Sequence, residues 1–169
     1  MSCFLISCDG ESNRAAERLS LDNDTIYQQG GYRVEVVDFE ALQPLLHQEN
    51  DKIQVINFWA TWCVPCVAEL PYFQKLEENF PEVELTLISL DFSTKVESDL
   101  LPFMKERSLS SRVILLNEPD ANRWIPEIDP DWTGAIPATI IYRGEKREFY
   151  QQSFTFESLS KEVKTFQNQ

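Results

Sequence analysis

NFWATWCVPC, at residues 57–66, places two cysteines, Cys63 and Cys66, two residues apart. Disulfide exchange needs a thiolate that attacks and a second thiol close enough to attack the mixed disulfide that results. The two-residue spacing provides that second thiol. If a helix begins directly after Cys63, its unpaired N–H groups and its dipole stabilise the thiolate and lower the pKa of Cys63. The motif therefore predicts a redox-active pair in which Cys63 attacks and Cys66 resolves the mixed disulfide.

The two residues between the cysteines refine this prediction. Pro65 fits the first turn of a helix, where its missing N–H is not needed. Val64 brings no imidazole or ammonium group that would stabilise the Cys63 thiolate further. The dipeptide therefore favours a reductase over a strong oxidant.

Hydrophobic patterns on both sides of the motif predict alternating strands and helices. Upstream, the apolar run at 52–60 is typical of a buried central strand. Downstream, a helix over 64–79 with a kink at Pro71 is predicted by apolar residues at three- and four-residue spacing, namely Val67, Leu70, Phe73 and Leu76. Further strands at 83–90 and 112–116 enclose a short helix at 99–107. This order implies right-handed crossovers and a sheet with a parallel core.

The flanks of the domain are less regular. Two extended pieces, at 25–27 and 32–37, precede a short helix capped by Asp38 and bent at Pro44. Residues 118–132 are rich in proline and acid, so we expect a loop or one irregular helical turn there. At the C-terminal end we expect a hairpin and a last helix: strands at 138–143 and 146–150, then a helix capped by Thr155. We place the folded domain at 25–169 and a tether or signal remnant at 1–24.

Taken together, NFWATWCVPC and the following Glu69-Leu70-Pro71 resemble the signature of the TlpA/ResA-like thiol-disulfide oxidoreductases, thioredoxin-superfamily proteins of the bacterial envelope. GAIPAT at 134–139 is similar to the cis-proline loop that thioredoxin-fold proteins place before the hairpin. The resemblance spans about residues 32–167. It implies an α/β fold with a central mixed sheet flanked by helices, an N-terminal extension, and a central insertion that includes 118–132.

The resemblance also implies catalytic roles. Cys63 would be the nucleophile and Cys66 the resolving thiol. Glu69 matches an acidic residue that is proposed in this family to influence the pKa values of the cysteines. Asn57 stands where cytoplasmic thioredoxins keep a buried aspartate, which moves any role in proton transfer toward Glu69. Glu is also a good helix former, so an ordinary solvated position for Glu69 remains the alternative.

A second set of residues is implied in substrate binding. Pro137 would be the cis-proline that packs against the disulfide and keeps metal out, and Ile136 would offer backbone groups to an extended substrate strand. The alternative for Pro137 is a trans-proline opening a strand. The other implied contacts surround the cysteines: Trp62, Val64 and Pro65. Trp59 and Trp62 would shield the site and offer apolar contact area. We expect Trp124 and Trp132 to be packing residues rather than partner contacts.

The implied partners are protein disulfide or dithiol substrates and an upstream electron donor. No cofactor is expected, and the chain is expected to be a monomer. The net charge of −13, from 28 acidic and 15 basic residues, leaves no basic surface for phosphates and argues against nucleic acid. No apolar run reaches the roughly eighteen residues of a spanning helix.

The N-terminus carries its own hypothesis. Leu5-Ile6-Ser7-Cys8 resembles a bacterial lipobox, in which the cysteine is lipidated, and residues 9–14 are typical of the polar tether that follows a lipid anchor. We therefore expect a protein of the cell envelope or periplasm, anchored through Cys8. Residues 1–7 lack a basic region and a full apolar region, so a free polar tail that carries Cys3 and Cys8 is the alternative.

Other functions of the cysteine pair fit the residues less well. A structural zinc site needs four ligands, and His47 is the single histidine of the chain. A copper chaperone would need a wider cysteine spacing and a nearby histidine. A thiol peroxidase of the peroxiredoxin kind would have proline and threonine where this chain has Ala60 and Ile56. A non-catalytic binding module would have no need of both thiols. Disulfide exchange is the prediction that remains.

Overall fold

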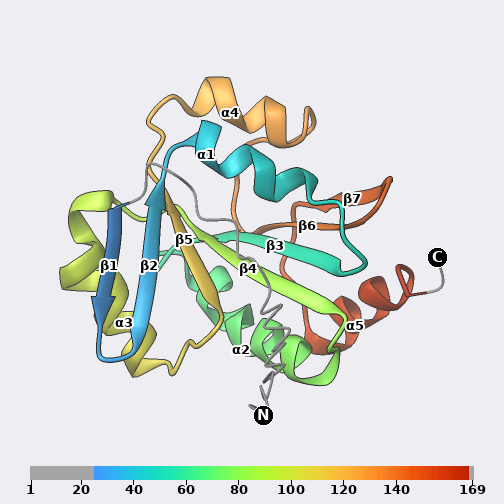
Figure 1. Cartoon of the computed structure of the whole chain (residues 1–169), viewed down its shortest axis with the longest axis horizontal. Helices are drawn as coiled ribbons and strands as arrows, with labels where there is room; N and C mark the ends of the chain where they lie inside the picture. Colours follow the sequence, from blue (N-terminus) through green and yellow to red (C-terminus); the bar gives the residue numbers. More distant parts are fainter. Residues whose placement is uncertain (1–24, 168–169) are drawn as a thin grey trace, which may run out of the picture.

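The computed structural model describes residues 25–167, which contain one seven-stranded mixed sheet (Figure 1). Its strands lie in the order β1 (Thr25–Gln29), β2 (Tyr32–Val37), β5 (Arg112–Leu116), β4 (Val83–Ser89), β3 (Ile53–Trp59), β6 (Ala138–Arg143) and β7 (Lys146–Tyr150). Strands β2, β5, β4 and β3 are mutually parallel, whereas β1, β6 and β7 pair antiparallel with their neighbours. The mixed sheet with a parallel core is therefore confirmed, as is the C-terminal hairpin.

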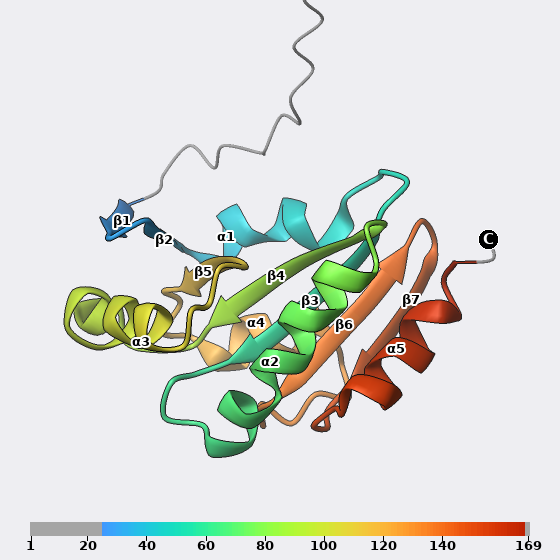
Figure 2. The same ribbon diagram turned by 90° about the horizontal axis from the view of Figure 1, so that it is seen from below.

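Helices cover both faces of the sheet (Figures 1 and 2). One face carries α2 (Val64–Asn79), α3 (Leu101–Glu106) and α5 (Phe156–Lys164), which share one hydrophobic core. The other face carries α1 (Phe39–Leu42), the 3-10 turn η1 (Gln43–His47) and α4 (Ala121–Ile128), which share a second core. Strand β3 contributes buried side chains to both cores and is buried along its whole length. The buried central strand predicted from the mostly apolar segment at 52–60 is therefore confirmed.

The start and end of α2 agree with the helix expected at 64–79. Cys63 is its N-cap, with extended backbone angles, and Pro65 lies in its first turn. The helix runs unbroken through Pro71, so this proline removes one backbone donor without ending the helix. Because β3 ends four residues before Cys63, the chain passes from the centre of the sheet straight into the cysteine motif.

The expectation of a loop or one irregular helical turn at 118–132 is wrong for about half of the segment, which forms a regular helix of eight residues. Residues 121–128 form α4, which buries Trp124 and Ile128 against the second core. These two side chains are four residues apart and so lie on one helix face. Their burial stabilises a short helix that the internal Pro126 disfavours, because tertiary packing overrides intrinsic propensity.

The helix expected at 99–107 begins earlier than predicted. A 3-10 turn η2 (Ser93–Lys95) and a π-helical turn η3 (Val96–Leu100) lead into α3. Val96 and Leu100 are buried on the same face, which fixes the extra turn against the first core. Among residues 25–167 no helix combines the length and the apolar character needed to cross a bilayer.

Candidate active site

Cys63 and Cys66 form a disulfide at the N-terminus of α2, with their Cα atoms 5.3 Å apart. The backbone N–H of Cys66 donates to the Sγ of Cys63 at 3.4 Å, so this sulfur lies over the unpaired N–H groups of the first turn. Cys63 is 6% exposed, whereas Cys66 is fully buried. A partner can therefore reach the sulfur of Cys63 first, and the helix terminus favours negative charge there when the disulfide is reduced.

The loop before β6 closes the other side of the disulfide. The Ile136–Pro137 peptide bond is cis, as the resemblance implied, and Pro137 is buried. The carbonyl oxygen of Ile136 lies 3.8 Å from the Sγ of Cys63. The indole N–H of Trp132 donates to the carbonyl oxygen of Ala135 at 2.8 Å and so fixes the loop from behind. The two predicted motifs, 73 residues apart in sequence, thus meet at one sulfur.

Glu69 is a buried carboxyl group one helical turn beyond Cys66. Its Oε1 accepts from the side-chain amide of Asn57 at 3.0 Å, and its Oε2 accepts from the backbone N–H of Phe154 at 2.7 Å. Burial raises the pKa of Glu69 from 4.5 to about 7, although both hydrogen bonds favour the carboxylate and act in the opposite direction. The solvated alternative for Glu69 is thereby wrong. The group is poised to take up or release a proton near neutral pH.

Asn57 links this carboxyl group to the sheet. Besides Glu69, its amide donates to the hydroxyl of Thr139 at 3.1 Å. Asn57 pairs with Thr139 across β3 and β6, so the register of the sheet sets this contact. All three side chains are almost completely buried.

Asp91 holds the turn that precedes Cys63, a role that the sequence analysis missed. Its carboxylate accepts from the backbone N–H of Thr61 at 3.0 Å and from the Thr61 hydroxyl at 2.6 Å. It also accepts from the hydroxyl of Ser89 at 2.8 Å. The available signal was the position of Asp91 just beyond the strand predicted at 83–90, because carboxyl ends of parallel strands meet at one edge of a sheet.

The four tryptophans take different places. Trp62 is exposed beside Cys63, whereas Trp59 is fully buried and its ring packs against Phe103 with centroids 5.6 Å apart. The expectation that Trp59 offers contact area to a partner is therefore wrong, because both faces of β3 are covered. Trp124 and Trp132 are buried edge to face in the second core, as expected of packing residues.

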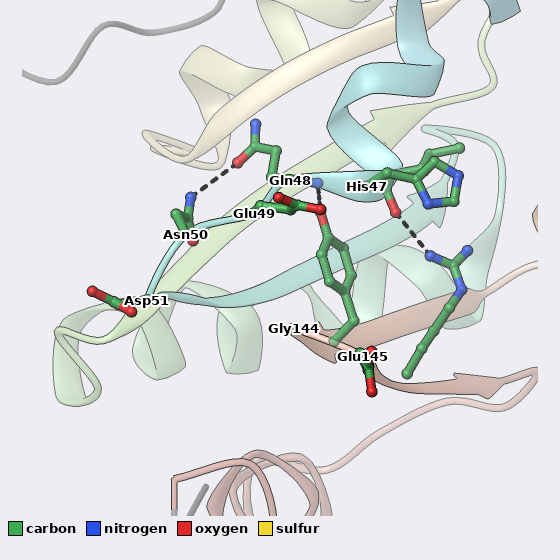
Figure 3. A pocket seen from close by; sticks show the side chains of 10 residues that line it. His47, Gln48, Glu49, Asn50, Asp51, Gly144 and Glu145 are labelled. Carbon is green, nitrogen blue, oxygen red and sulfur yellow. Dashed lines mark hydrogen bonds between the residues drawn. The ribbon is translucent and has the colours of Figure 1, made fainter.

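A cavity of about 730 Å³ lies at the opposite end of the sheet (Figure 3). His47 lines it, together with polar residues of the loop before β3 and of the turn between β6 and β7. The hydroxyl of Tyr142 accepts from the backbone N–H of Gln48 and donates to the carbonyl oxygen of Leu45, so its hydrogen-bonding capacity is used locally. This end of β3 lies one strand length away from Cys63. The cavity is not part of the cysteine site, and residues 25–167 hold no cluster of three potential metal ligands.

Known proteins share the sequence features of this site. A model of the AhpC/TSA family matches residues 35–146, most of the described chain. The chain belongs to the AhpC/TSA family. Among curated relatives, the thiol-disulfide oxidoreductase ResA of Oceanobacillus iheyensis is 33% identical over 129 residues, which cover 74% of this chain and 62% of that protein. The expected resemblance to TlpA/ResA-like thioredoxins is confirmed.

Solved structures agree on the fold. A secreted Mycobacterium tuberculosis disulfide oxidoreductase superposes with a TM-score of 0.53 at 22% identity, over 69% of this chain and 83% of that chain. A thioredoxin-related protein of Neisseria meningitidis serogroup B gives 0.59 at 22% identity, over 71% and 88%. The chain spans about half to three fifths of the length of the ResA proteins of Bacillus cereus and Oceanobacillus iheyensis. These likenesses establish a thioredoxin-like fold.

Proposed function

We propose that this protein is a thiol-disulfide oxidoreductase that exchanges disulfides with protein substrates, and that it works as a reductase. The observation that carries this proposal is the Cys63–Cys66 disulfide at the start of α2, with Cys63 reachable and Cys66 enclosed. The relatives named thiol-disulfide oxidoreductase support it.

The reaction follows from the positions of the two sulfurs. In the reduced protein, the Cys63 thiolate attacks one sulfur of a substrate disulfide, and the other substrate sulfur leaves as a thiolate that takes up a proton. Cys66 then loses its proton and attacks the Cys63 sulfur of the mixed disulfide. This step releases the second substrate thiolate and forms the Cys63–Cys66 bond, so two electrons have passed to the substrate. An upstream dithiol donor restores the reduced pair.

Glu69 supplies the proton acceptor for the second step. It lies one turn beyond Cys66 on the buried side of α2, and its pKa of about 7 suits proton exchange at neutral pH. Asn57 and the N–H of Phe154 hold the carboxyl group in position.

The substrate contacts surround the exposed edge of Cys63. We assign this role to Trp62, Val64 and Pro65 on one side and to Ile136 and Pro137 on the other. The carbonyl oxygen of Ile136 lies next to the attacking sulfur and can accept a backbone N–H of an extended substrate strand.

The location and anchoring of the protein belong to the same proposal. We place it in the cell envelope or periplasm as a monomer, with residues 25–169 as the thioredoxin-like domain and residues 1–24 as a tether lipidated at Cys8. Cys8 lies outside the described residues. The neighbour described as secreted supports a location where disulfides persist.

The test is covalent capture. Cys66→Ser should trap mixed disulfides with protein substrates through Cys63, seen as adducts on a non-reducing gel that a thiol reagent dissolves. Cys63→Ser is the matched control and should trap none when Cys3 and Cys8 are replaced by serine in both variants. If Cys66→Ser forms no adducts while its fold is intact, the protein is a binding module rather than an enzyme. If reduced wild-type protein instead consumes hydrogen peroxide faster than disulfides, it is a thiol peroxidase.

A further inference from the structure

Over its first three turns, the solvent side of α2 lacks the charges that normally cover an exposed helix face. From Val64 to Gln74 the only charged residue is Glu69, and it points into the protein. The outward positions of this stretch are exposed apolar residues: Val64, Pro65, Ala68, Pro71 and Tyr72. Lys75 is the first exposed charge along the helix. Over the first turns the outward face of α2 is therefore apolar, as the inward face is, instead of charged.

This uncharged face is unusual within a chain of which 25% is charged. Five large apolar side chains are exposed among the described residues, and four of them belong to segments that border Cys63. Trp62 (61% exposed) and Val64 (80%) flank it, and Tyr72 (39%) lies two turns further along α2. Phe92 (71%) follows Asp91, which accepts a hydrogen bond from Thr61, two residues before Cys63. Only Ile26 (47%), on β1, lies elsewhere. A clustered apolar surface of this kind marks an interaction site.

We propose that Trp62, Val64, Ala68 and Tyr72, here called the α2 stripe, are the docking surface for an apolar, uncharged segment next to the disulfide of the substrate protein. This inference rests on the proposed function and names the substrate chemistry that the site selects. It extends the contact area beyond the two cysteines and the cis-proline loop, along the outside of the helix.

Two arguments identify the occupant. First, a substrate that bonds to Cys63 already contacts Trp62 and Val64, so the stripe continues an interface that the reaction requires. Its length from Val64 to Tyr72 is about 12 Å at 1.5 Å per residue, which about four residues of extended chain span. Second, a second copy of this chain docked on the stripe would cover Cys63 and block exchange.

The test compares the rates at which the reduced protein attacks two peptide disulfides that differ in the residues flanking the cysteine. Each synthetic peptide carries one cysteine as a mixed disulfide with thionitrobenzoate, flanked on both sides by four residues that are either apolar or polar and uncharged. Attack by the reduced protein releases coloured thionitrobenzoate. We expect the apolar peptide to react about tenfold faster than the polar one, because burial of one apolar side chain contributes that much or more. The small disulfide DTNB, which has no flanking residues, measures the intrinsic reactivity of Cys63. Every protein in this test also carries Cys3→Ser and Cys8→Ser, so that these two thiols release no thionitrobenzoate.

The variants use uncharged substitutions so that the field at Cys63 is unchanged. Ala68→Gln combined with Tyr72→Gln should reduce the preference to about twofold or less while the rate with DTNB stays at the wild-type value. Ile26→Gln, which removes an exposed apolar side chain far from α2, is the matched control and should keep the full preference.

The outcomes separate this inference from the proposed function. If wild-type protein shows no preference for the apolar peptide, or if the double variant keeps that preference, the proposed docking surface is wrong. The proposed oxidoreductase activity is unaffected by either result. The same conclusion follows if Ile26→Gln loses the preference equally, or if the stripe holds a dimer that the double variant dissociates. If the reduced protein fails to react even with DTNB, both proposals are wrong.

Discussion

Glu69 shows at the scale of one residue how burial and chemistry are linked. Its spacing from Cys66 was visible in the sequence, because positions three apart share a helix face. The burial of this carboxyl group depends on Asn57 of β3 and on the segment around Phe154, which is 85 residues away in sequence. Asp91 was missed for the same reason: its partner Thr61 lies 30 residues away. The cysteines and Pro137, in contrast, are recognisable from local motifs.

The raised pKa of Glu69 predicts a pH-dependent stability of the oxidised protein. The folded state binds the proton more tightly than the unfolded state, with a pKa of about 7 against 4.5. This group therefore contributes its full stabilisation below about pH 4.5, and the contribution is lost as the pH rises through about 7. The shift corresponds to about 3 kcal/mol.

The measurement is urea unfolding of wild type and Glu69→Gln across pH 4 to 9. The wild-type free energy of unfolding, relative to that of the variant, should fall by about 3 kcal/mol over the interval and level off above pH 8. Subtraction of the variant removes the contributions of the other acidic groups. A difference that is constant with pH would show that Glu69 titrates normally.

At the scale of elements, periodicity predicted α2 and β3 well and α4 poorly. The apolar residues of α2 repeat over sixteen residues, whereas α4 has eight, with a proline inside. Its helix depends on Trp124 and Ile128 meeting a core built by α1 and β3, which no local pattern reveals. The early start of the α3 region has a similar cause, since Val96 is fixed by the first core.

This explanation predicts that the burial of Trp124 stabilises α4 and, with it, the folded protein. Trp124→Ala should lower the free energy of unfolding by about 3 to 5 kcal/mol, the usual effect of emptying a large buried site. Trp62→Ala is the matched comparison and should cost less than about 1 kcal/mol, because its side chain is mostly exposed. Denaturant titration measures both. Equal effects of the two substitutions would mean that Trp124 does not anchor α4.

At the scale of the whole molecule, the parallel core of the sheet and the net charge were both accessible from the sequence, whereas the order of the strands in the sheet was not. Alternating strands and helices around residues 53–116 predicted the parallel core, and the final hairpin predicted its antiparallel edge. Which helices cover each face of the sheet could be seen only in the structure. The net charge of −13 says nothing about the fold, but it sets the field that a charged disulfide meets.

The field predicts a preference among small disulfides. Reduced protein should react faster with cationic cystamine than with anionic oxidised glutathione, and the ratio of the two rates should fall as salt is added. At about 0.15 M ionic strength the screening length is about 8 Å, so most of the long-range attraction is lost. Stopped-flow kinetics at increasing salt measures the ratio. A ratio that does not change with salt would show that net charge does not steer substrates to Cys63.

Alkylation of the reduced protein by iodoacetamide as a function of pH, with each cysteine followed by mass spectrometry, tests the role of Cys63 most directly. Cys63 should be modified first, with a midpoint clearly below about 8.5, the value of a free cysteine, because its sulfur lies at the N-terminus of α2. Cys66, which is enclosed, should be modified much more slowly. Equal modification of the two cysteines, or a midpoint for Cys63 at or above that of a free thiol, would contradict the assignment of Cys63 as the nucleophile.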